Sequence, residues 1–144
     1  MKLSTKGRYG LRAFIDIAVY SEVEPVSLAS VAKRQDISIS YLEQLMIKVR
    51  KAGLIESVRG ANGGYILAKP AEEISVGDVL RALEGELMPV DCVAYGDSNK
   101  GGCSTESCCV SKFVWKKIND ALNDTVNNMY ISELVAESKT ISNN

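Results

Sequence analysis

The fold is decided by residues 27–68, which read SLASVAKRQDISISYLEQLMIKVRKAGLIESVRGANGGYILA. Ser27 is a typical helix N-cap, because its hydroxyl can accept a hydrogen bond from the first helical turn. It precedes a short amphipathic segment that runs to about residue 35. Asp36, Ile37 and Ser38 follow, and aspartate and serine favour a turn. The first part of this stretch therefore predicts a short helix and a turn.

A second helix is predicted from about residue 40 to residue 52. Ser40 is its expected N-cap, and Glu43 three residues later completes the capping-box pattern. Gly53 is expected to end the helix, since glycine tolerates the left-handed conformation found after helix C-termini. Four apolar residues recur at helical spacing and form its expected buried stripe: Leu42, Leu45, Met46 and Val49.

A β-hairpin is predicted directly after this helix. Residues 54–58 and 65–68 favour strands, and the glycine-rich residues 59–64 between them favour a turn. Two helices joined by a short turn and followed by a hairpin form a winged helix-turn-helix. In that arrangement the second helix recognises DNA and the hairpin is the wing. We therefore expect a mainly α fold with one small β-hairpin.

Apolar periodicity predicts further helices outside this stretch. They cover residues 7–20, 76–83 with Ser75 as N-cap, 109–128 and 131–135. The expected organisation is a DNA-binding domain at 1–69, a dimerisation region at 70–137 with a cysteine-rich loop at 91–109, and a frayed tail at 138–144.

The long C-terminal helix predicted at 109–128 carries an apolar stripe. Its members are three or four residues apart: Val110, Phe113, Val114, Ile118, Leu122 and Val126, with Trp115 beside them. Pairing with the same helix of a second subunit would bury the stripe, and a two-fold dimer suits a palindromic DNA site. The alternative is a monomer in which the stripe packs on its own winged helix. We favour the homodimer.

Charge is divided unevenly along the chain. Residues 1–69 carry 11 Lys/Arg and 6 Asp/Glu, a net of +5, whereas residues 70–144 carry 6 and 12, a net of −6. A basic first half suits phosphate binding, although solvated charge can also segregate by chance. No apolar run approaches the roughly 18 residues of a membrane span, and the N-terminus lacks a signal-peptide core. We therefore expect a cytoplasmic protein.

The second helix and the wing carry side chains suited to DNA. Gln44 offers both a donor and an acceptor to a base edge, and Glu43 can accept from cytosine N4. Arg59, beside the wing glycines, can enter a narrow minor groove. The remaining candidates offer hydroxyls, positive charge or accessible backbone N–H groups: Ser38, Ser40, Tyr41, Lys48, Arg50 and Gly60.

Each of these candidates also has a plainer interpretation. Glu43 can serve only as a capping acid, and Gln44 and Arg50 can belong to an ordinary solvated helix face. The glycines can serve only the tight hairpin. The combination, basic and in winged-helix order, is what favours a DNA interface.

The four cysteines lie in one segment: Cys92, Cys103, Cys108 and Cys109. In a cytoplasmic protein such a cluster suits zinc, an iron–sulfur cluster or redox-active thiols better than structural disulfides. The chain has no histidine to act as a base for a cysteine nucleophile and no phosphate-binding loop, so an enzyme is not expected. A thiol site beside a DNA-binding domain predicts a regulator that depends on its cofactor.

Three motifs resemble a known family. KLSTKGRYG at 2–10, SYLEQL at 40–45 and VRGANGGY at 58–65 are similar to signatures of the bacterial IscR-type iron–sulfur cluster regulators and of their relatives, the cysteine-metabolism repressors. The resemblance covers roughly residues 1–135. It implies homodimeric transcription factors in which the residues matching Glu43 and Gln44 contact bases and the residue matching Arg59 enters the minor groove. It also implies that the long helix crosses its partner helix.

IscR-like members hold a [2Fe–2S] cluster with three cysteines and one histidine. The three cysteines correspond here to Cys92, Cys103 and Cys109. Lys112 stands at the histidine position, and a protonated lysine is a poor ligand. Cys108 is the expected substitute, while Glu106, Asp91 or a ligand from the partner subunit are alternatives.

These observations predict a homodimeric repressor of iron–sulfur assembly genes that binds double-stranded DNA at a palindromic operator and senses cluster status. The [2Fe–2S] cluster is favoured over zinc. The alternative is a cluster-free repressor of cysteine or sulfur metabolism that responds to a partner protein or to thiol oxidation.

Overall fold

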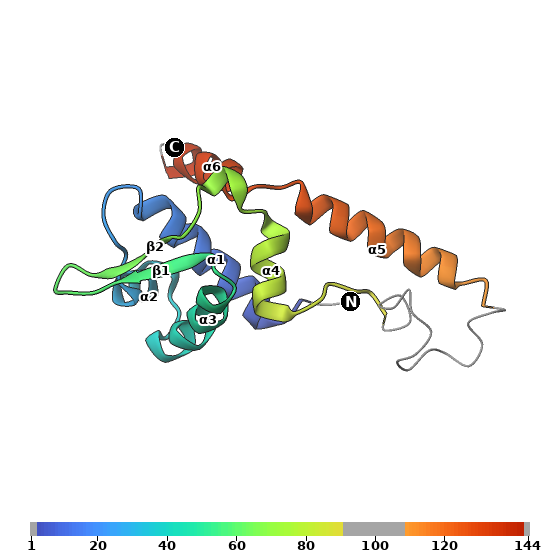
Figure 1. Cartoon of the computed structure of the whole chain (residues 1–144), viewed down its shortest axis with the longest axis horizontal. Coiled ribbons are helices and arrows are strands. Elements are labelled where there is room, and N and C mark those ends of the chain that lie inside the picture. Colours follow the sequence, from blue (N-terminus) through green and yellow to red (C-terminus); the bar gives the residue numbers. More distant parts are fainter. Residues whose placement is uncertain (1–2, 91–108, 143–144) are drawn as a thin grey trace.

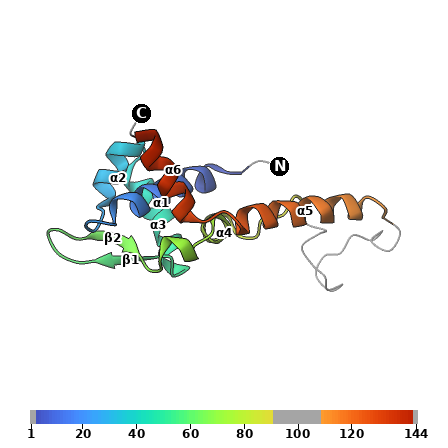
Figure 2. The same cartoon turned by 90° about the horizontal axis from the view of Figure 1, so that it is seen from above.

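The computed structural model describes residues 3–90 and 109–142, which form six α-helices and a two-stranded antiparallel sheet (Figure 1). In chain order the elements are α1 (Thr5–Tyr20), α2 (Leu28–Gln35), α3 (Ile39–Lys51), β1 (Ile55–Val58), β2 (Gly64–Leu67), a short 3-10 helix η1 (Ala71–Glu73), α4 (Val76–Glu84), α5 (Lys112–Asn127) and α6 (Ile131–Ser142). The two views agree that α5 projects as a rod from a body built by the other elements (Figures 1 and 2). The predicted mainly α fold with one hairpin is confirmed.

The helix-turn-helix begins and turns where the sequence predicts. The Ser27 hydroxyl accepts a hydrogen bond from the Ser30 N–H at 3.2 Å and caps α2. Asp36 ends α2 in the left-handed conformation, with φ 55°. An aspartate tolerates this conformation because its short polar side chain can bond locally. The chain then turns into α3.

The predicted N-cap of α3 is wrong: the helix is capped two residues earlier than expected. Ser38 is the N-cap, because its backbone is extended and its hydroxyl accepts from the Tyr41 N–H at 3.3 Å. Ser40 instead lies inside the first helical turn, so the capping box expected between Ser40 and Glu43 does not form. The Glu43 side chain is exposed on the helix surface. An N-cap needs extended backbone before the helix, and Ser38 meets that condition.

The predicted buried stripe of α3 is confirmed. Leu42, Leu45, Met46 and Val49 are at most 1% exposed. They share one core with Phe14 and Ile17 of α1, with Val79 and Leu83 of α4, and with Ile131 and Val135 of α6. The body is therefore packed across the predicted boundary at residue 69, and the division into domains stays a prediction about function.

The hairpin is anchored at its base against the segment before α2. Ile55 lies opposite Leu67, and Val58 lies opposite Gly64. Val26 exchanges backbone hydrogen bonds with Tyr65, at 2.9 and 2.8 Å. A Cβ at Gly64 would lie 2.4 Å from the Val26 carbonyl, so only glycine permits this approach. Both predicted strands are confirmed, with ends shifted by one residue at most.

The C-terminal half returns to the body after the projecting helix. Ser75 is the N-cap of α4, as predicted. Its side chain and that of Asp78 form a reciprocal capping box, which was not predicted. α6 was predicted to end near residue 135, but it continues to Ser142, so residues 138–142 are helical. Lys139 of α6 forms an ion pair with Glu22 at 2.8 Å.

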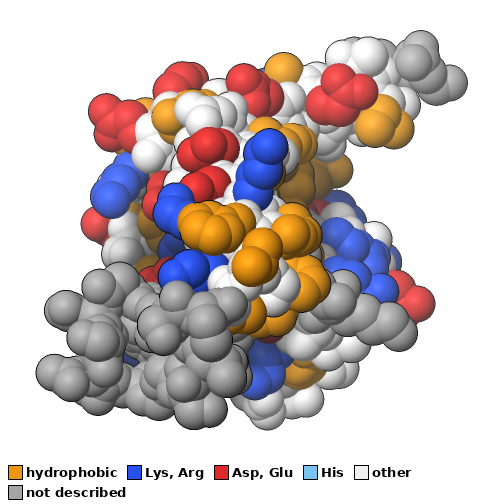
Figure 3. Space-filling model, turned by 90° about the vertical axis from the view of Figure 1, so that its right-hand side faces the viewer, with side chains coloured by type: hydrophobic (Ala, Val, Ile, Leu, Met, Phe, Trp, Pro, Cys, Tyr) orange, Lys and Arg blue, Asp and Glu red, His pale blue; other side chains and the backbone are white. Residues whose placement is uncertain are grey.

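Within the described residues, helix α5, called the arm below, packs against the hydrophobic core only near its C-terminal end. It begins at Lys112, three residues later than predicted. Val126 is buried and Leu122 packs against the core, whereas Val110, just before the arm, and Phe113, Val114 and Ile118 are 78, 66, 52 and 42% exposed. Seen from the free end of the arm, hydrophobic side chains gather in one patch with basic side chains beside it (Figure 3). Among the described residues, no helix has both the length and the apolar character of a membrane span.

Candidate nucleic-acid interface

Helix α3 presents a polar face opposite its buried stripe. Ser40, Glu43 and Gln44 lie exposed in the first half of the helix, and Arg50 lies exposed in its last turn. The helix periodicity that buries Leu42 and Leu45 places these side chains outward. The structure therefore presents the predicted base-reading and phosphate-binding residues at the protein surface.

Ser38 and Tyr41 both have structural partners, although Ser38 is also exposed. The Ser38 hydroxyl caps α3. Tyr41 is half-buried, and its hydroxyl oxygen lies 3.0 Å from Thr5 Oγ1. Its ring meets the edge of the Tyr9 ring, with 6.3 Å between centroids. These contacts fix the start of α3 against the start of α1.

A basic surface on α1 beside the recognition helix was missed in the sequence. The guanidinium carbons of Arg8 and Arg12 lie 5.8 and 5.5 Å from the centroid of the Tyr9 ring. The same ring contacts Tyr41, so both arginines stand next to the first turn of α3. The signal was present in the motif at 2–10, but its spacing indicates only one amphipathic helix. The contact between Tyr9 and Tyr41 joins residues far apart in the sequence, so the local spacing could not predict it.

The wing places Arg59 at the surface, beside a turn whose glycines are required by the backbone. Gly60 has φ 114°, in the left-handed region that glycine adopts at little cost. A Cβ at Gly63 would lie 2.1 Å from the Val58 carbonyl oxygen. The hairpin alone therefore accounts for both glycines, and the accessible backbone at Gly60 is an additional property of this turn.

A buried ion pair fixes the angle between α1 and α2. Arg34 donates to both carboxylate oxygens of Asp16, with Nη2–Oδ1 at 2.6 Å and Nε–Oδ2 at 2.9 Å. Gln35 Nε2 also donates to Asp16, at 2.9 Å. The hydrogen bond with Asp16 is the main cause that raises the pKa of Arg34. Since α2 supports the recognition helix, this network holds the helix-turn-helix on α1.

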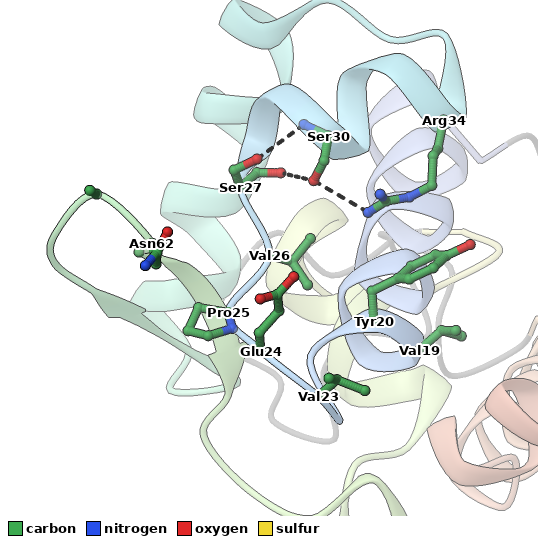
Figure 4. Close-up of a pocket in the computed structure, with 12 residues that line it drawn as sticks. Val19, Tyr20, Val23, Glu24, Pro25, Val26, Ser27, Ser30, Arg34 and Asn62 are labelled. Atoms are coloured by element: carbon green, nitrogen blue, oxygen red, sulfur yellow. Dashed lines mark hydrogen bonds between the residues drawn. The ribbon is translucent and has the colours of Figure 1, made fainter.

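A surface pocket of about 390 Å³ separates the wing turn from the start of α2 (Figure 4). It is lined by Asn62 of the turn and by Tyr20, Ser30 and Arg34 of the body. The Arg34 guanidinium stacks on Tyr20 at 3.9 Å and donates to Asp16 and Ser30. Its charge thus serves the helix pair, and the pocket is not favoured as a ligand site.

Of the predicted cluster ligands, the structure places Cys109. Its Sγ lies 3.1 Å from the Ser111 hydroxyl, which is the main cause of a lowered thiol pKa; the backbone N–H of Lys112 adds to it. A thiol that readily becomes a thiolate suits metal ligation. Cys92, Cys103 and Cys108 lie outside the described residues, as do the alternative ligands Asp91 and Glu106.

The exposed polar face of α3, the wing and the basic end of α1 define a winged helix-turn-helix DNA-binding protein. The chain belongs to the Rrf2 family, described as iron-dependent transcriptional regulators, which it matches over residues 3–137. It is therefore a transcription regulator and not an enzyme, as predicted.

Individual relatives include both branches named by the motifs. The transcriptional regulator IscR of Escherichia coli is 41% identical over 141 residues, covering 98% of this chain and 84% of the relative. The structure of T. potens IscR superposes with a TM-score of 0.76 at 40% identity, covering 96% of this chain and 88% of that one. CymR, the global cysteine regulator of B. subtilis, superposes with a TM-score of 0.75 at 36% identity, covering 95 and 98%.

Proposed function

We propose that this protein is a homodimeric repressor of iron–sulfur assembly genes whose DNA affinity depends on a [2Fe–2S] cluster. The observation that carries the proposal is the joining, in one chain, of a winged helix and a four-cysteine segment that ends at the start of the arm. Similarity to IscR over nearly the whole chain supports it.

The arm supports a dimer. Its apolar side chains at Phe113, Val114 and Ile118 are exposed, and exposed clusters of this kind usually mark interaction surfaces. In the proposed dimer two arms pack against each other and bury these side chains. The two recognition helices then face two half-sites of a palindromic operator.

The DNA contacts follow from the surface of α3 and the wing. Glu43 and Gln44 contact base edges in the major groove, and Arg59 enters the adjacent minor groove. Phosphate contacts come from hydroxyls, a cation and a backbone N–H: Ser38, Ser40, Tyr41, Arg50 and Gly60. The Ser38 hydroxyl accepts its capping hydrogen bond and can still donate to a phosphate, whereas the Tyr41 hydroxyl shares its contact with Thr5.

Four thiolates hold the cluster in this proposal: Cys92, Cys103, Cys108 and Cys109. When bound, the cluster would link these residues through its iron atoms, and this link would depend on iron supply and redox state. Only Val110 and Ser111 separate Cys109 from the arm, and the lowered pKa of its thiol fits a ligand role. Ligation at Cys109 would therefore restrain the N-terminal end of the arm. If the ligated state favours one dimer geometry, cluster binding changes the affinity of the dimer for DNA.

A second candidate function is repression of cysteine metabolism without a cluster. It is favoured by the similarity to CymR and by the absence of a histidine in the chain. In that case DNA binding responds to oxidation of the cysteines or to a bound partner protein.

The deciding experiment is purification without oxygen, followed by visible absorption and assays of iron and acid-labile sulfide. We expect a coloured protein with iron and sulfide, and loss of both in Cys92→Ala. A colourless protein that resists reconstitution would refute the cluster and favour the cysteine-metabolism function.

DNA recognition is tested separately by selecting binding sites from random duplexes. We expect a palindrome, with Gln44→Ala weakening binding by about 1–3 kcal/mol and relaxing base preference in each half-site. Glu43→Ala should admit additional sequences, because an acidic side chain penalises some of them by repulsion. Uniform weakening across all sequences in Gln44→Ala would contradict base reading by Gln44.

A further inference from the structure

The arm is seated on α4 by a polar contact that we call the clamp, made of Arg81, Asn123 and Asn127. Arg81 Nη2 donates to Asn123 Oδ1 at 2.9 Å and to Asn127 Oδ1 at 2.6 Å. Residues four apart in a helix lie on one face, so a single guanidinium holds two successive turns of the arm. Each hydrogen bond is directional, and together they define the rotation of the arm about its axis as well as its angle to α4.

Two further contacts restrict the same junction. Asn123 Nδ2 donates to the Leu87 carbonyl at 3.1 Å, which ties the chain leaving α4 to the arm. Gly77 of α4 lies directly beneath the arm, where a Cβ would be 2.4 Å from Asn127 Oδ1 and 3.2 Å from Val126 Cγ2. The arm therefore sits closely on α4 in one orientation.

The orientation of the arm matters because the arm is long. With 16 residues it extends about 24 Å, at about 1.5 Å per residue. A change of about 10° at its base would displace its far end by about 4 Å, close to the rise of roughly 3.4 Å per base pair. In the proposed dimer, a small change at the clamp would therefore shift the two DNA-binding bodies relative to each other on the scale of one base pair.

We propose that the clamp determines which distance between operator half-sites the dimer accepts, so that Arg81, Asn123 and Asn127 are specificity-determining residues that touch no DNA. This inference rests on the proposed dimer through the arm. Because each arm is fixed to its own DNA-binding body by the clamp, the angle at the clamp sets the separation and relative rotation of the two recognition helices. Apolar contacts alone, such as those of Leu122 and Val126, would tolerate rotation of the arm.

The test uses the operator selected from random duplexes by the wild-type dimer. Further duplexes carry one or two base pairs inserted or removed at its centre, and each inserted pair rotates one half-site by about 35° relative to the other. Dissociation constants are measured for wild type, Arg81→Ala and Asn127→Ala. Lys139→Ala is the control, because it also removes an exposed polar contact but lies on α6, away from the arm.

We expect wild type and Lys139→Ala to lose about tenfold in affinity for each base pair of altered spacing, taking the cost of a mismatched base pair as the scale. In the clamp variants this loss should fall to about threefold or less, or the preferred spacing should shift, with an unchanged preference for bases within each half-site. The Asn127 side chain is exposed, so Asn127→Ala tests the proposal even where Arg81→Ala disturbs folding.

Two results would overturn the inference. A clamp variant that weakens all duplexes equally, with the wild-type spacing profile, would show that the clamp only stabilises the fold. A wild-type protein that is monomeric, or that selects no palindrome, would overturn the proposed dimer and this inference with it. The two failures are distinguishable because the second is seen in the wild type alone.

Discussion

Removing the Asp16 carboxylate should lower the unfolding free energy more than breaking an exposed ion pair does. The Asp16 side chain is 1% exposed and receives hydrogen bonds from Arg34 and Gln35. Breaking a buried pair by removing one partner costs about 3–5 kcal/mol, because the other charge stays uncompensated. Arg34 is 32% exposed and can turn toward water, which places the expected cost for Asp16→Ala at about 3 kcal/mol. Asp16→Asn, which keeps one acceptor, should cost about 2 kcal/mol.

The assay is urea unfolding followed by circular dichroism, at one fixed protein concentration because the proposed dimerisation would contribute to apparent stability. Lys139→Ala is the matched control, since it breaks an ion pair whose partners are both about half exposed, and exposed pairs contribute about 0–1 kcal/mol. High salt should reduce the control effect and leave the Asp16 effect largely intact. A loss below about 1 kcal/mol in Asp16→Ala would refute the reasoning, because it would place the buried network in the same class as the surface pair.

Three further predictions test other contacts, with Ser40→Ala as the control for Ser38→Ala. Glu84 accepts hydrogen bonds from backbone N–H groups of Ser4 and Gly7 at the start of α1, and the Ser4 side chain is the main cause of its lowered pKa. Because the folded pKa is lowered, the ionised Glu84 carboxylate stabilises the folded protein fully above the unfolded pKa near 4.5, and this stabilisation is lost as pH falls through the folded pKa. Glu84→Gln should therefore lower the unfolding free energy by roughly 1 kcal/mol at pH 7 and by progressively less below about pH 4, as measured by unfolding at a series of pH values. Ser38→Ala should lower the unfolding free energy by about 1 kcal/mol while Ser40→Ala changes it little, and equal losses in urea titrations would contradict Ser38 as the cap. Gly10→Ala would place a Cβ 2.4 Å from Leu83 Cδ1 and should cost about 1–3 kcal/mol, measurable as a lower Tm.

The elements of the winged helix were predictable because their signals are local. The stripe from Leu42 to Val49 repeats at helical spacing, and Gly53 marks the end of α3 with φ 77°. The cap of α3 was mispredicted because Ser38 and Ser40 are both good capping residues, and only the backbone conformation distinguishes them. The extension of α6 was missed because residues 136–142 are largely polar and mostly exposed, so they carry no apolar stripe that would mark a helix.

The candidate site was predictable in kind but only partly in arrangement. Glu43 and Gln44 follow from their place on a helix whose other face is buried. The contact of Tyr41 with Thr5 and Tyr9 joins residues more than thirty positions apart, and no local pattern specifies it. The cysteines predict soft ligation by their chemistry alone, whereas a ligand set is a property of the folded chain.

Among the described residues, several polar contacts join one helix to another. Asp16 and Arg34 join α1 to α2, Glu84 joins α4 to α1, and Arg81 joins α4 to the arm. Leucine and isoleucine fill the core between these junctions, but apolar packing accepts several orientations at similar energy. A satisfied polar network accepts only the orientation in which its donors and acceptors meet. The proposed dimer must place its two recognition helices on two half-sites to within about one base pair, and we infer that directional contacts at the helix junctions supply that restriction.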